Sequence, residues 1–399
     1  MRFFYAFVFP APMAPFAKRV LSIEPSPTVR ISDLIAESQG QGKKILSLAI
    51  GEPDFPTPAH IVEAAKKALD DGFTKYTAAP GIRELREAIA EKSQKENGIP
   101  ATPENVIVAP TKHTLFMTFM ALLDSGDEAL VPDPGWVSYA PMVTLAGAKP
   151  VPIRAADEDG FVPSTETVAE AITPRTRLIV LNSPSNPAGS VYTRSEMRGL
   201  ADLAADHDLT VVSDEIYEKI LYDGEHVSPA SLEGMFDRTI TVNGFSKTYS
   251  MTGWRLGWLV APTPLYLQIV KVQEHTITCA TAFAQKAGVA ALRGPAGPLK
   301  TMVDEFRARR DVVLRELKRI DRVSTDRPSG AFYVFPRVDV RTDSASLAER
   351  ILREANVAVT PGSAFGEAGE GHLRLSYAAS RETIVECIRR IGEVLKSIG

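Results

Sequence analysis

Short hydrophobic runs alternate with helical patterns along the middle of the chain. From about residue 60 to 290, runs rich in Val, Ile and Thr are followed by polar turns or by helical stretches such as 114–124. Alternation over this length predicts an α/β fold, a three-layer structure with a mostly parallel sheet and helices on both faces. The runs occupy residues 104–110, 128–134, 176–184, 209–217, 238–246 and 255–262.

The pattern changes after about residue 295. Helical patterns at 297–319, 345–355 and 380–397 enclose strand-like runs near 331–336 and 372–377, which is typical of an α+β unit. We therefore expect four segments: an N-terminal extension (1–19), an N-terminal arm that packs with the smaller domain (20–58), a large domain (59–295) and a small C-terminal domain (296–399).

Composition restricts the partners. The 399 residues are 44% hydrophobic and 24% charged, with a net charge of −4 and no block of like charge. This balance predicts a globular protein that binds small molecules and copies of itself, with no nucleic acid. The apolar start, Met1 to Pro12, is too short to cross a membrane and has no clear cleavage pattern. We favour an upstream start codon, with the natural chain beginning at Met13, over a targeting or docking segment, and a cytoplasmic location.

The cysteines and histidines give no metal-binding pattern. Cys279 and Cys387 lie far apart, with no CxxC spacing, and the six histidines are scattered. Two cysteines could form one disulfide, but we favour two buried free thiols. No metal site is predicted.

Candidate chemistry gathers where the predicted strands end, which is where parallel sheets bind ligands. In Asn243–Trp258, NGFSKTYSMTGWRLGW, a strand ends directly before Ser246 and Lys247, and Arg255 follows. A lysine forms a Schiff base with an aldehyde cofactor, and a hydroxyl and a guanidinium suit a phosphate. A bare lysine and arginine would fit a solvated loop, but this strand-end context favours a site.

The same string resembles the cofactor-lysine signature of class I aminotransferases. These are fold-type I pyridoxal-phosphate enzymes of the aspartate aminotransferase family, and the prokaryotic aspartate aminotransferase subgroup is the nearest pattern. The resemblance runs from about Val20 to Gly399 through motifs in family order. They are IGEPDFPTP, YTAAPGIRELREAI, LLDSGDEALVPDPGWVSY, NSPSNPAG, SDEIYEKI, GAFYVFP and HLRLSYA.

The resemblance implies roles around the cofactor ring. Asp214 would face the pyridine nitrogen and keep it protonated, so that the ring acts as an electron sink. Tyr217 and Asn186 would hydrogen-bond the ring 3-hydroxyl, and Trp136 would stack on the ring. The alternatives are a helix N-cap, a packed tyrosine, a turn asparagine and a core tryptophan.

It also implies a carboxylate clamp and a shared site. Arg374 would bind the substrate α-carboxylate bidentately, and Gly51 would bring the backbone close to the same group. Tyr76 would reach the cofactor phosphate of the neighbouring subunit, so the enzyme would be a homodimer with shared active sites. A tyrosine that packs within its own subunit is the alternative.

Two positions depart from the family pattern. The phosphate turn usually carries Gly-Gly or Ser-Gly, where this chain has Pro110-Thr111-Lys112. The backbone donors there would be Thr111 and Lys112, with the Thr111 hydroxyl as an added donor. Gly135 stands where many relatives have tyrosine, and we expect it to loosen the pocket wall beside Trp136.

The implied reaction is transamination by a ping-pong mechanism, with Lys247 as Schiff-base residue and general base. Ser26, Thr28 and Lys112 resemble the residues that recognise a side-chain carboxylate, so we favour aspartate or glutamate as substrate. Aromatic and prephenate aminotransferases share much of this pattern. A carbon–sulfur lyase would keep the cofactor and change the outcome. A cofactor-binding regulator would need a basic DNA-binding domain before the fold.

Overall fold

The computed structural model describes residues 16–40, 42 and 44–398. The apolar start, Met1 to Pro12, and the predicted start at Met13 lie outside the described residues. Within them, no helix is long and apolar enough to cross a membrane.

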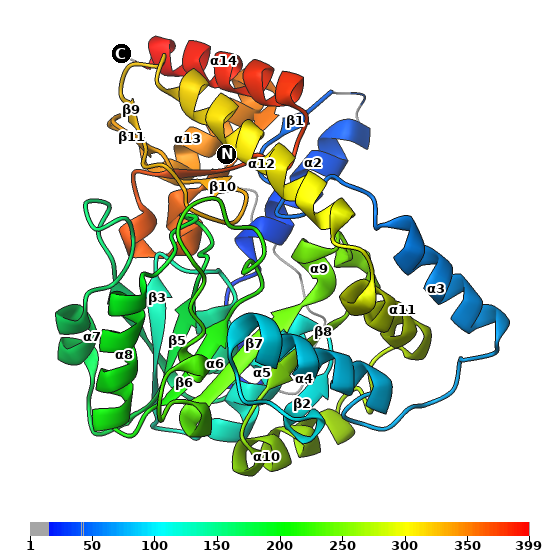
Figure 1. The fold of residues 1–399 in the computed structure, drawn as a ribbon. Helices are drawn as coiled ribbons and strands as arrows, with labels where there is room; N and C mark the ends of the chain where they lie inside the picture. The colour runs from blue at the N-terminus through cyan, green and yellow to red at the C-terminus, as the bar shows by residue number, and fades with distance from the viewer. Residues whose placement is uncertain (1–15, 41, 43, 399) are drawn as a thin grey trace, which may run out of the picture.

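A seven-stranded sheet forms the centre of the larger part of the chain, in the order β2-β8-β7-β6-β5-β3-β4 (Figure 1). All neighbours are parallel except β8, which is antiparallel to β2 and β7, so the mostly parallel sheet is confirmed. The strands are β2 (Val106–Val108), β3 (Glu128–Asp133), β4 (Lys149–Arg154), β5 (Thr176–Asn182), β6 (Thr210–Asp214), β7 (Thr239–Gly244) and β8 (Gly257–Val260).

Within this seven-stranded sheet, the sequence pattern missed one strand, the edge strand β4, KPVPIR. It carries two prolines, and most of its residues are partly or fully exposed. Proline is tolerated at a sheet edge, because the missing N–H leaves no interior hydrogen bond unmade. A hydrophobicity pattern therefore gives little sign of this strand.

Alternate residues of the central strands enter different cores. Leu178 and Val180 of β5 pack on one face with α5, α6 and α10, whereas Ile179 and Leu181 pack on the other with α7 and α8. A strand buried on both faces is hydrophobic throughout, as its sequence predicted. The helices of this part are α3 (Ala59–Asp70), α4 (Arg83–Asn97), α5 (Thr111–Leu122), α6 (Tyr139–Leu145), α7 (Thr165–Ala171), α8 (Arg194–Asp206), α9 (Phe245–Thr248), α10 (Thr263–Glu274) and α11 (Ala282–Arg293).

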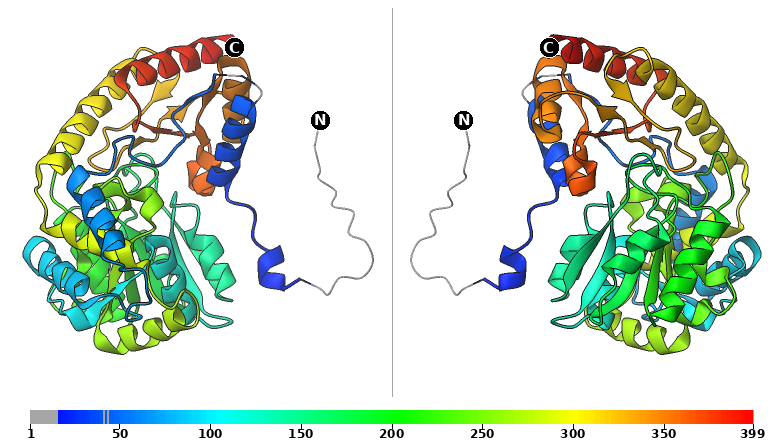
Figure 2. Two further views of the ribbon diagram at one scale, coloured as in Figure 1. Left: turned by 90° about the vertical axis from the view of Figure 1, so that its right-hand side faces the viewer. Right: turned by 90° about the vertical axis from the view of Figure 1, so that its left-hand side faces the viewer.

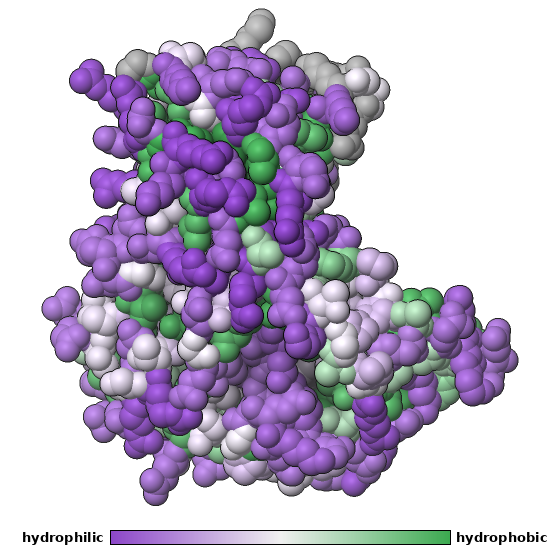
Figure 3. Space-filling view, turned by 45° about the horizontal axis from the view of Figure 1, so that its top comes forward, coloured by the Kyte–Doolittle hydropathy of each residue, from purple (hydrophilic) through white to green (hydrophobic). Residues whose placement is uncertain are grey.

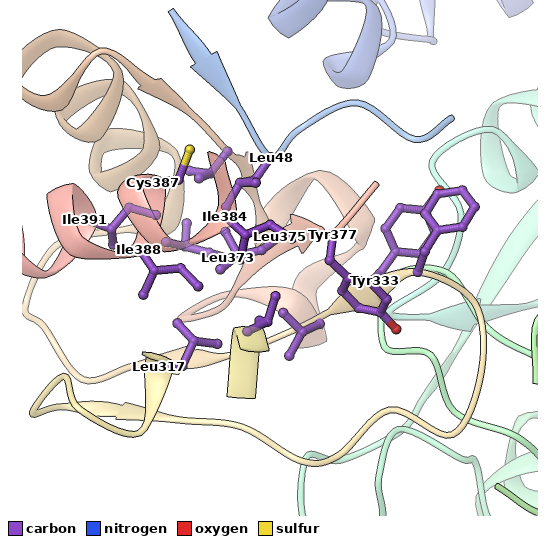
Figure 4. Packing of buried hydrophobic residues seen from close by; sticks show 14 of the residues in the cluster. Leu48, Leu317, Tyr333, Leu373, Leu375, Tyr377, Ile384, Cys387, Ile388 and Ile391 are labelled. Atoms are coloured by element: carbon purple, nitrogen blue, oxygen red, sulfur yellow. The ribbon is translucent and has the colours of Figure 1, made fainter. Parts of the chain in front are cut away.

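The C-terminal part packs above the sheet in Figure 1, and its core also takes in Ile216, Tyr217, Ile220 and Tyr222 from the segment after β6. Figure 4 shows some of this core, where Tyr333 and Tyr377 lie beside aliphatic side chains of β14 and α14. Its helices are α12 (Gly297–Leu317), α13 (Ser344–Ala355) and α14 (Arg381–Ser397). Its strands are β9 (Val323–Ser324), β10 (Tyr333–Val334), β11 (Arg337–Val338), β12 (Val357–Ala358), β13 (Thr360–Pro361) and β14 (Leu373–Ser376).

The N-terminal arm joins this C-terminal part. Its strand β1 (Leu46–Ser47) pairs in parallel with β12, and Ile35 of α2 (Pro27–Gly40) packs in a small core with Ala358. The preceding α1 (Lys18–Leu21) lies at the edge of the molecule, as Figure 2 shows. The domain boundaries at 19, 58 and 295 stay predictions.

Both cysteines are free. Cys387 is buried, as expected, but Cys279 is only half-buried. The expectation of two buried thiols is therefore right for one of them.

Candidate active site

Parallel pairing brings the polar ends of β5 and β6 side by side. Asn182 and Asp214 are partners in register, and Asn182 Nδ2 donates to the Asp214 carbonyl oxygen at 2.9 Å. Asn182 Oδ1 accepts from the backbone N–H of Asn186 at 2.9 Å. One asparagine therefore ties the strand end that carries Asp214 to the turn that carries Asn186.

Asp214 is held by a tyrosine that the sequence analysis did not single out. The Tyr139 hydroxyl donates to Asp214 Oδ2 at 2.7 Å, and the Tyr139 ring meets Trp136 edge-on at 5.2 Å. Burial raises the pKa of Asp214 to about 6, and the Tyr139 hydrogen bond opposes this shift. The only sequence signal was spacing, since Tyr139 follows Trp136 by three residues at the start of α6.

Lys247 lies in the short helix α9, directly after β7. Its Nζ donates to the Gly51 carbonyl oxygen at 2.6 Å, a contact across 196 positions of sequence. Burial lowers the pKa of Lys247 to about 8, and the charges of Arg374 and Arg255 add to this effect. A neutral amine is therefore more accessible here than on a solvated lysine.

Arg374 of β14 is a buried cation, 2% exposed. Its Nη2 donates to the Ala49 carbonyl oxygen at 2.6 Å, and its Nη1 donates to Asn186 Oδ1 at 3.2 Å. Its Nε has no hydrogen-bond partner, and no carboxylate pairs with it among residues 16–40, 42 and 44–398. A buried guanidinium without a counter-ion is costly unless an anion binds there.

Tyr217 faces a second tyrosine that the sequence analysis did not single out. The hydroxyls of Tyr217 and Tyr333 lie 2.8 Å apart, and both side chains are buried. The motif GAFYVFP contains Tyr333, but nothing in its local sequence indicates a partner 116 positions away.

The departure at the phosphate turn has a packing reason. Thr111 begins α5 after Pro110, and its hydroxyl donates to the Asn243 carbonyl oxygen at 3.2 Å. A Cβ on Gly244 or Gly257 would lie 2.2 Å from Thr111 Oγ1. The threonine therefore occupies space that these two glycines leave, and the N-terminus of α5 stays close to the ends of β7 and β8.

Ser246 and Arg255 lie at the same end of the sheet. Ser246 is buried in α9, whereas Arg255 is exposed. Arg255 directly follows a short turn, and its own φ is 53°, in the left-handed region. Arg255 Nη1 donates to the Thr252 carbonyl oxygen at 2.7 Å. Left-handed backbone at a residue other than glycine is strained, and such strain gathers at functional sites.

Lys112 and Trp136 lie together beside these residues. The Lys112 Nζ is 4.9 Å from the centre of the Trp136 ring. Partial burial, and then the charge of Arg255, lower the pKa of Lys112. Gly135 sits in a tight turn where a Cβ would lie 2.3 Å from the Pro132 carbonyl oxygen. The glycine permits this path of the backbone, and its effect on the pocket wall beside Trp136 stays a prediction.

Three further predicted residues come from the N-terminal arm and the segment after α3. Ser26 is half-buried just before α2, and the side chain of Thr28 lies outside the described residues. Tyr76 is 86% exposed, in the segment after α3. It therefore does not pack within its own subunit. Figure 1 shows α3 at the outer edge of the molecule, and Figure 3 shows this edge as a projection.

A buried charge network lies beneath the turn that joins Asp214 to Tyr217. Glu215, Glu218 and His226 bring their ligand atoms within 4.8 Å of one another, a grouping that no sequence spacing revealed. His226 Nε2 lies 2.9 Å from Glu215 Oε2, and Lys92 Nζ contacts Glu218. Burial raises the pKa of Glu218, but the positive charges of Lys92, His226 and Lys219 together outweigh it and lower the pKa to about 2. These charges compensate the carboxylates, so the cluster serves as an ion-pair network.

The comparison with known families decides what this geometry belongs to. Residues 43–391 match the model of the family described as aminotransferase class I and II. This chain belongs to that family. Class I and II aminotransferases depend on pyridoxal phosphate, and the chain is such an enzyme.

Relatives of this aminotransferase match almost its whole length. It is 44% identical to aromatic-amino-acid aminotransferase 2 of Thermococcus litoralis, over 95% of this chain and 97% of the relative. It is 44% identical to aspartate/prephenate aminotransferase of Thermus thermophilus, over 96% and 99%. The structure of Thermus thermophilus aspartate aminotransferase with maleate is similar with a TM-score of 0.92, 43% identity and coverage of 96% and 100%.

The donor set of the aminotransferase fits its cofactor and an amino-acid substrate. Lys247 offers an amine whose pKa is lowered, and Asp214 offers a buried carboxylate that is held in place by a hydroxyl. Arg374 offers a buried Nε that lacks a partner. These are the groups that an aldehyde, a ring nitrogen and a carboxylate require.

Proposed function

We propose that this aminotransferase moves an amino group between a dicarboxylic L-amino acid, aspartate or glutamate, and a 2-oxo acid, with Lys247 as its catalytic base. The observation that carries the proposal is the pair of cations, buried Arg374 and half-buried Lys247, which donate to the backbone carbonyls of residues 49 and 51. The Arg374 guanidinium suits a substrate carboxylate. The Lys247 amine, once neutral, suits proton transfer at the neighbouring carbon.

When bound, pyridoxal phosphate supplies a ring that stabilises negative charge at the substrate Cα. Lys247 Nζ takes the proton from the substrate Cα and delivers it to the carbon on the other side of the transferred nitrogen. Because burial lowers the pKa of Lys247 to about 8, more of the amine is neutral near pH 7 than for an ordinary lysine. Holding the base beside its proton adds the advantage of proximity.

The other residues orient the reacting groups. Asp214 would meet the ring nitrogen and hold its proton, while Tyr139 fixes the carboxylate. Tyr217 and Asn186 would bind the ring 3-oxygen, and Trp136 would cover the ring. Thr111 and Lys112 offer backbone N–H groups to the phosphate, with Ser246 and Arg255 beside them. Gly51 and Arg374 hold the substrate α-carboxylate.

Dicarboxylic specificity is supported by the surroundings of Trp136. Lys112 lies over its ring, where it can meet a second carboxylate. Ser26 and Thr28 would complete the recognition of that carboxylate from the N-terminal arm. Similarity to an aromatic-amino-acid enzyme favours a second candidate, because Trp136 and Tyr139 also offer aromatic contacts to a ring substrate.

We also propose a cytoplasmic homodimer with shared active sites. The support is Tyr76, whose exposed ring on a projecting segment has no role within its own subunit. In a dimer it would reach the phosphate of the second copy. Burial of this exposed tyrosine against a partner would stabilise the contact.

Absorbance spectra test the proposal directly. The purified protein should show the visible band of the bound cofactor, lose it with aspartate and regain it with 2-oxoglutarate. Phenylalanine and alanine serve as matched amino donors. A band that responds to phenylalanine and ignores aspartate would replace the dicarboxylic substrate with an aromatic one. Absence of any band after addition of pyridoxal phosphate would overturn the roles given to Lys247 and Asp214.

A further inference from the structure

Tyr333 stands between the residues that would hold the substrate and those that would hold the cofactor. Its side chain is 1% exposed, and its hydroxyl lies 2.8 Å from that of Tyr217. The guanidinium of Arg374 lies 4.6 Å from the centre of the Tyr333 ring. One side chain therefore contacts both the carboxylate clamp and the tyrosine of the ring 3-oxygen.

The Tyr333 hydroxyl has its place because residue 51 is glycine. A Cβ on Gly51 would lie 2.8 Å from Tyr333 Oη, too close for any other residue without movement of the ring. The Gly51 carbonyl oxygen accepts the hydrogen bond from Lys247 Nζ. The hydroxyl pair is thus packed against the backbone that supports the lysine.

Hydrogen-bond counting limits what this pair can do. Each tyrosine hydroxyl has one proton to donate, and two hydroxyls 2.8 Å apart share one hydrogen bond. If Tyr217 donates to a ring oxygen, it can only accept from Tyr333. If Tyr217 donates to Tyr333, its proton is no longer available for a hydrogen bond to the ring oxygen. The proton of Tyr333 therefore decides where the proton of Tyr217 points.

We propose that Tyr333 is a positioning residue that turns the Tyr217 hydroxyl toward the cofactor and relays carboxylate binding at Arg374 to it. This inference rests on the proposed function, because it takes the roles of Tyr217 and Arg374 from there. The coupling is electrostatic. A carboxylate on Arg374 offsets the positive charge over the Tyr333 ring, which makes the hydroxyl a weaker donor to Tyr217.

The direction of the effect follows from the Arg374 charge. Burial raises the pKa of Tyr333, and Arg374 and the Tyr217 hydrogen bond oppose the rise. When a substrate carboxylate neutralises Arg374, that opposition weakens. Tyr217 then accepts a weaker hydrogen bond from Tyr333 and is itself a weaker donor, so the cofactor oxygen gains negative character. Substrate binding would in this way raise the basicity of the neighbouring cofactor nitrogen, which favours its protonated form.

The test is a pH titration of the visible cofactor band in the Tyr333→Phe variant. Tyr377→Phe is the matched control, because Tyr377 is buried in the same core and its hydroxyl bonds the Ala331 carbonyl oxygen instead. Each protein is titrated alone and with succinate, a dicarboxylate that has no amine to transfer. Thermal denaturation checks that both variants stay folded.

We expect the midpoint of Tyr333→Phe without succinate to rise by roughly half a pH unit, because Tyr217 becomes a weaker donor. The shift that succinate causes should fall to less than about half of the wild-type shift, while the Tyr377→Phe protein follows the wild type. A Tyr333→Phe midpoint and succinate response equal to the wild type would overturn the inference alone. A wild-type protein without a cofactor band would overturn the proposed function instead.

Discussion

The floor of the candidate active site is formed by buried Asp214, Tyr217 and Arg374 with half-buried Lys247, whereas its rim, formed by Tyr76, Lys112 and Arg255, is exposed. On the floor, Asp214 ends β6 and Arg374 lies within β14, so the register of the sheets sets the positions of both. The rim comes from a helix start, a strained turn and a projecting segment. A single chain therefore preforms the floor, while the rim stays open to a phosphate and, in the homodimer proposed above, to a second copy.

This contrast is also electrostatic. On the floor, burial moves the pKa of Asp214 up to about 6 and that of Lys247 down to about 8. Both groups are thereby brought closer to neutral pH, where a proton can be moved with little cost. The rim cations are more exposed, although Lys112 is partly covered, and salt should weaken their hold on the phosphate more than it affects the floor.

The largest expected effect comes from removing the floor lysine. Lys247→Ala should lower the rate of transamination by at least roughly 10⁴-fold, since both the covalent anchor and the base are lost. Lys112→Ala, on the rim, should cost only about tenfold, because it removes one exposed contact to the second substrate carboxylate and leaves the backbone N–H groups for the phosphate. Steady-state kinetics with aspartate and 2-oxoglutarate measure both. Equal losses in the two variants would break the distinction between floor and rim.

The pH dependence of cofactor capture tests the burial of Lys247. Only the neutral amine attacks the aldehyde, and burial lowers the pKa of Lys247 to about 8. The rate at which cofactor-free protein combines with pyridoxal phosphate should therefore level off above about pH 8 and fall about tenfold per pH unit well below it. Stopped-flow absorbance gives this profile. A midpoint near the ordinary lysine value would place Lys247 in solvent, like the rim.

Tyr139→Phe sharpens the account of the floor itself. The variant removes the donor to Asp214 Oδ2, so the pKa of Asp214 should rise above about 6 and more of the carboxylate should be protonated at neutral pH. We expect kcat/KM to fall roughly tenfold at neutral pH, the lower end for a hydrogen bond to a charged group. The loss should shrink at higher pH. Tyr192→Phe, at another buried tyrosine, is the control, and an equal, pH-independent loss there would contradict the role of Tyr139.

The smallest effect is expected at the rim. Tyr76→Phe should weaken cofactor binding only a few-fold, the value of one exposed hydrogen bond, and should leave the melting temperature of the cofactor-free protein unchanged. Mixed dimers of a Lys247→Ala chain and a Tyr76→Phe chain distinguish the source of the tyrosine. If Tyr76 acts across the dimer, the one lysine-bearing site is intact and binds cofactor as the wild type does. Weakened binding at that site would mean that Tyr76 acts within its own chain.

Local patterns in the sequence determined the α/β sheet, the family and the polar strand ends. Runs of Val, Ile and Leu predicted strands that are buried on both faces. The motifs around Lys247, Asp214 and Arg374 contain the residue types that the proposed chemistry needs. Strand β4 was not predicted, because an edge strand with prolines has no such hydrophobic run. The packing reason for Thr111 also escaped, since Gly244 and Gly257 lie more than a hundred positions away.

The tertiary structure alone decided which polar groups support one another. Tyr139 meets Asp214 across 75 positions, and Tyr333 meets Tyr217 across 116. Hydrophobic periodicity is a local signal, because it reports which face of an element is buried. A hydrogen bond between distant side chains depends instead on strand register and the packing of two elements. Those contacts exist only once the chain has folded, so no local pattern in the sequence predicts them.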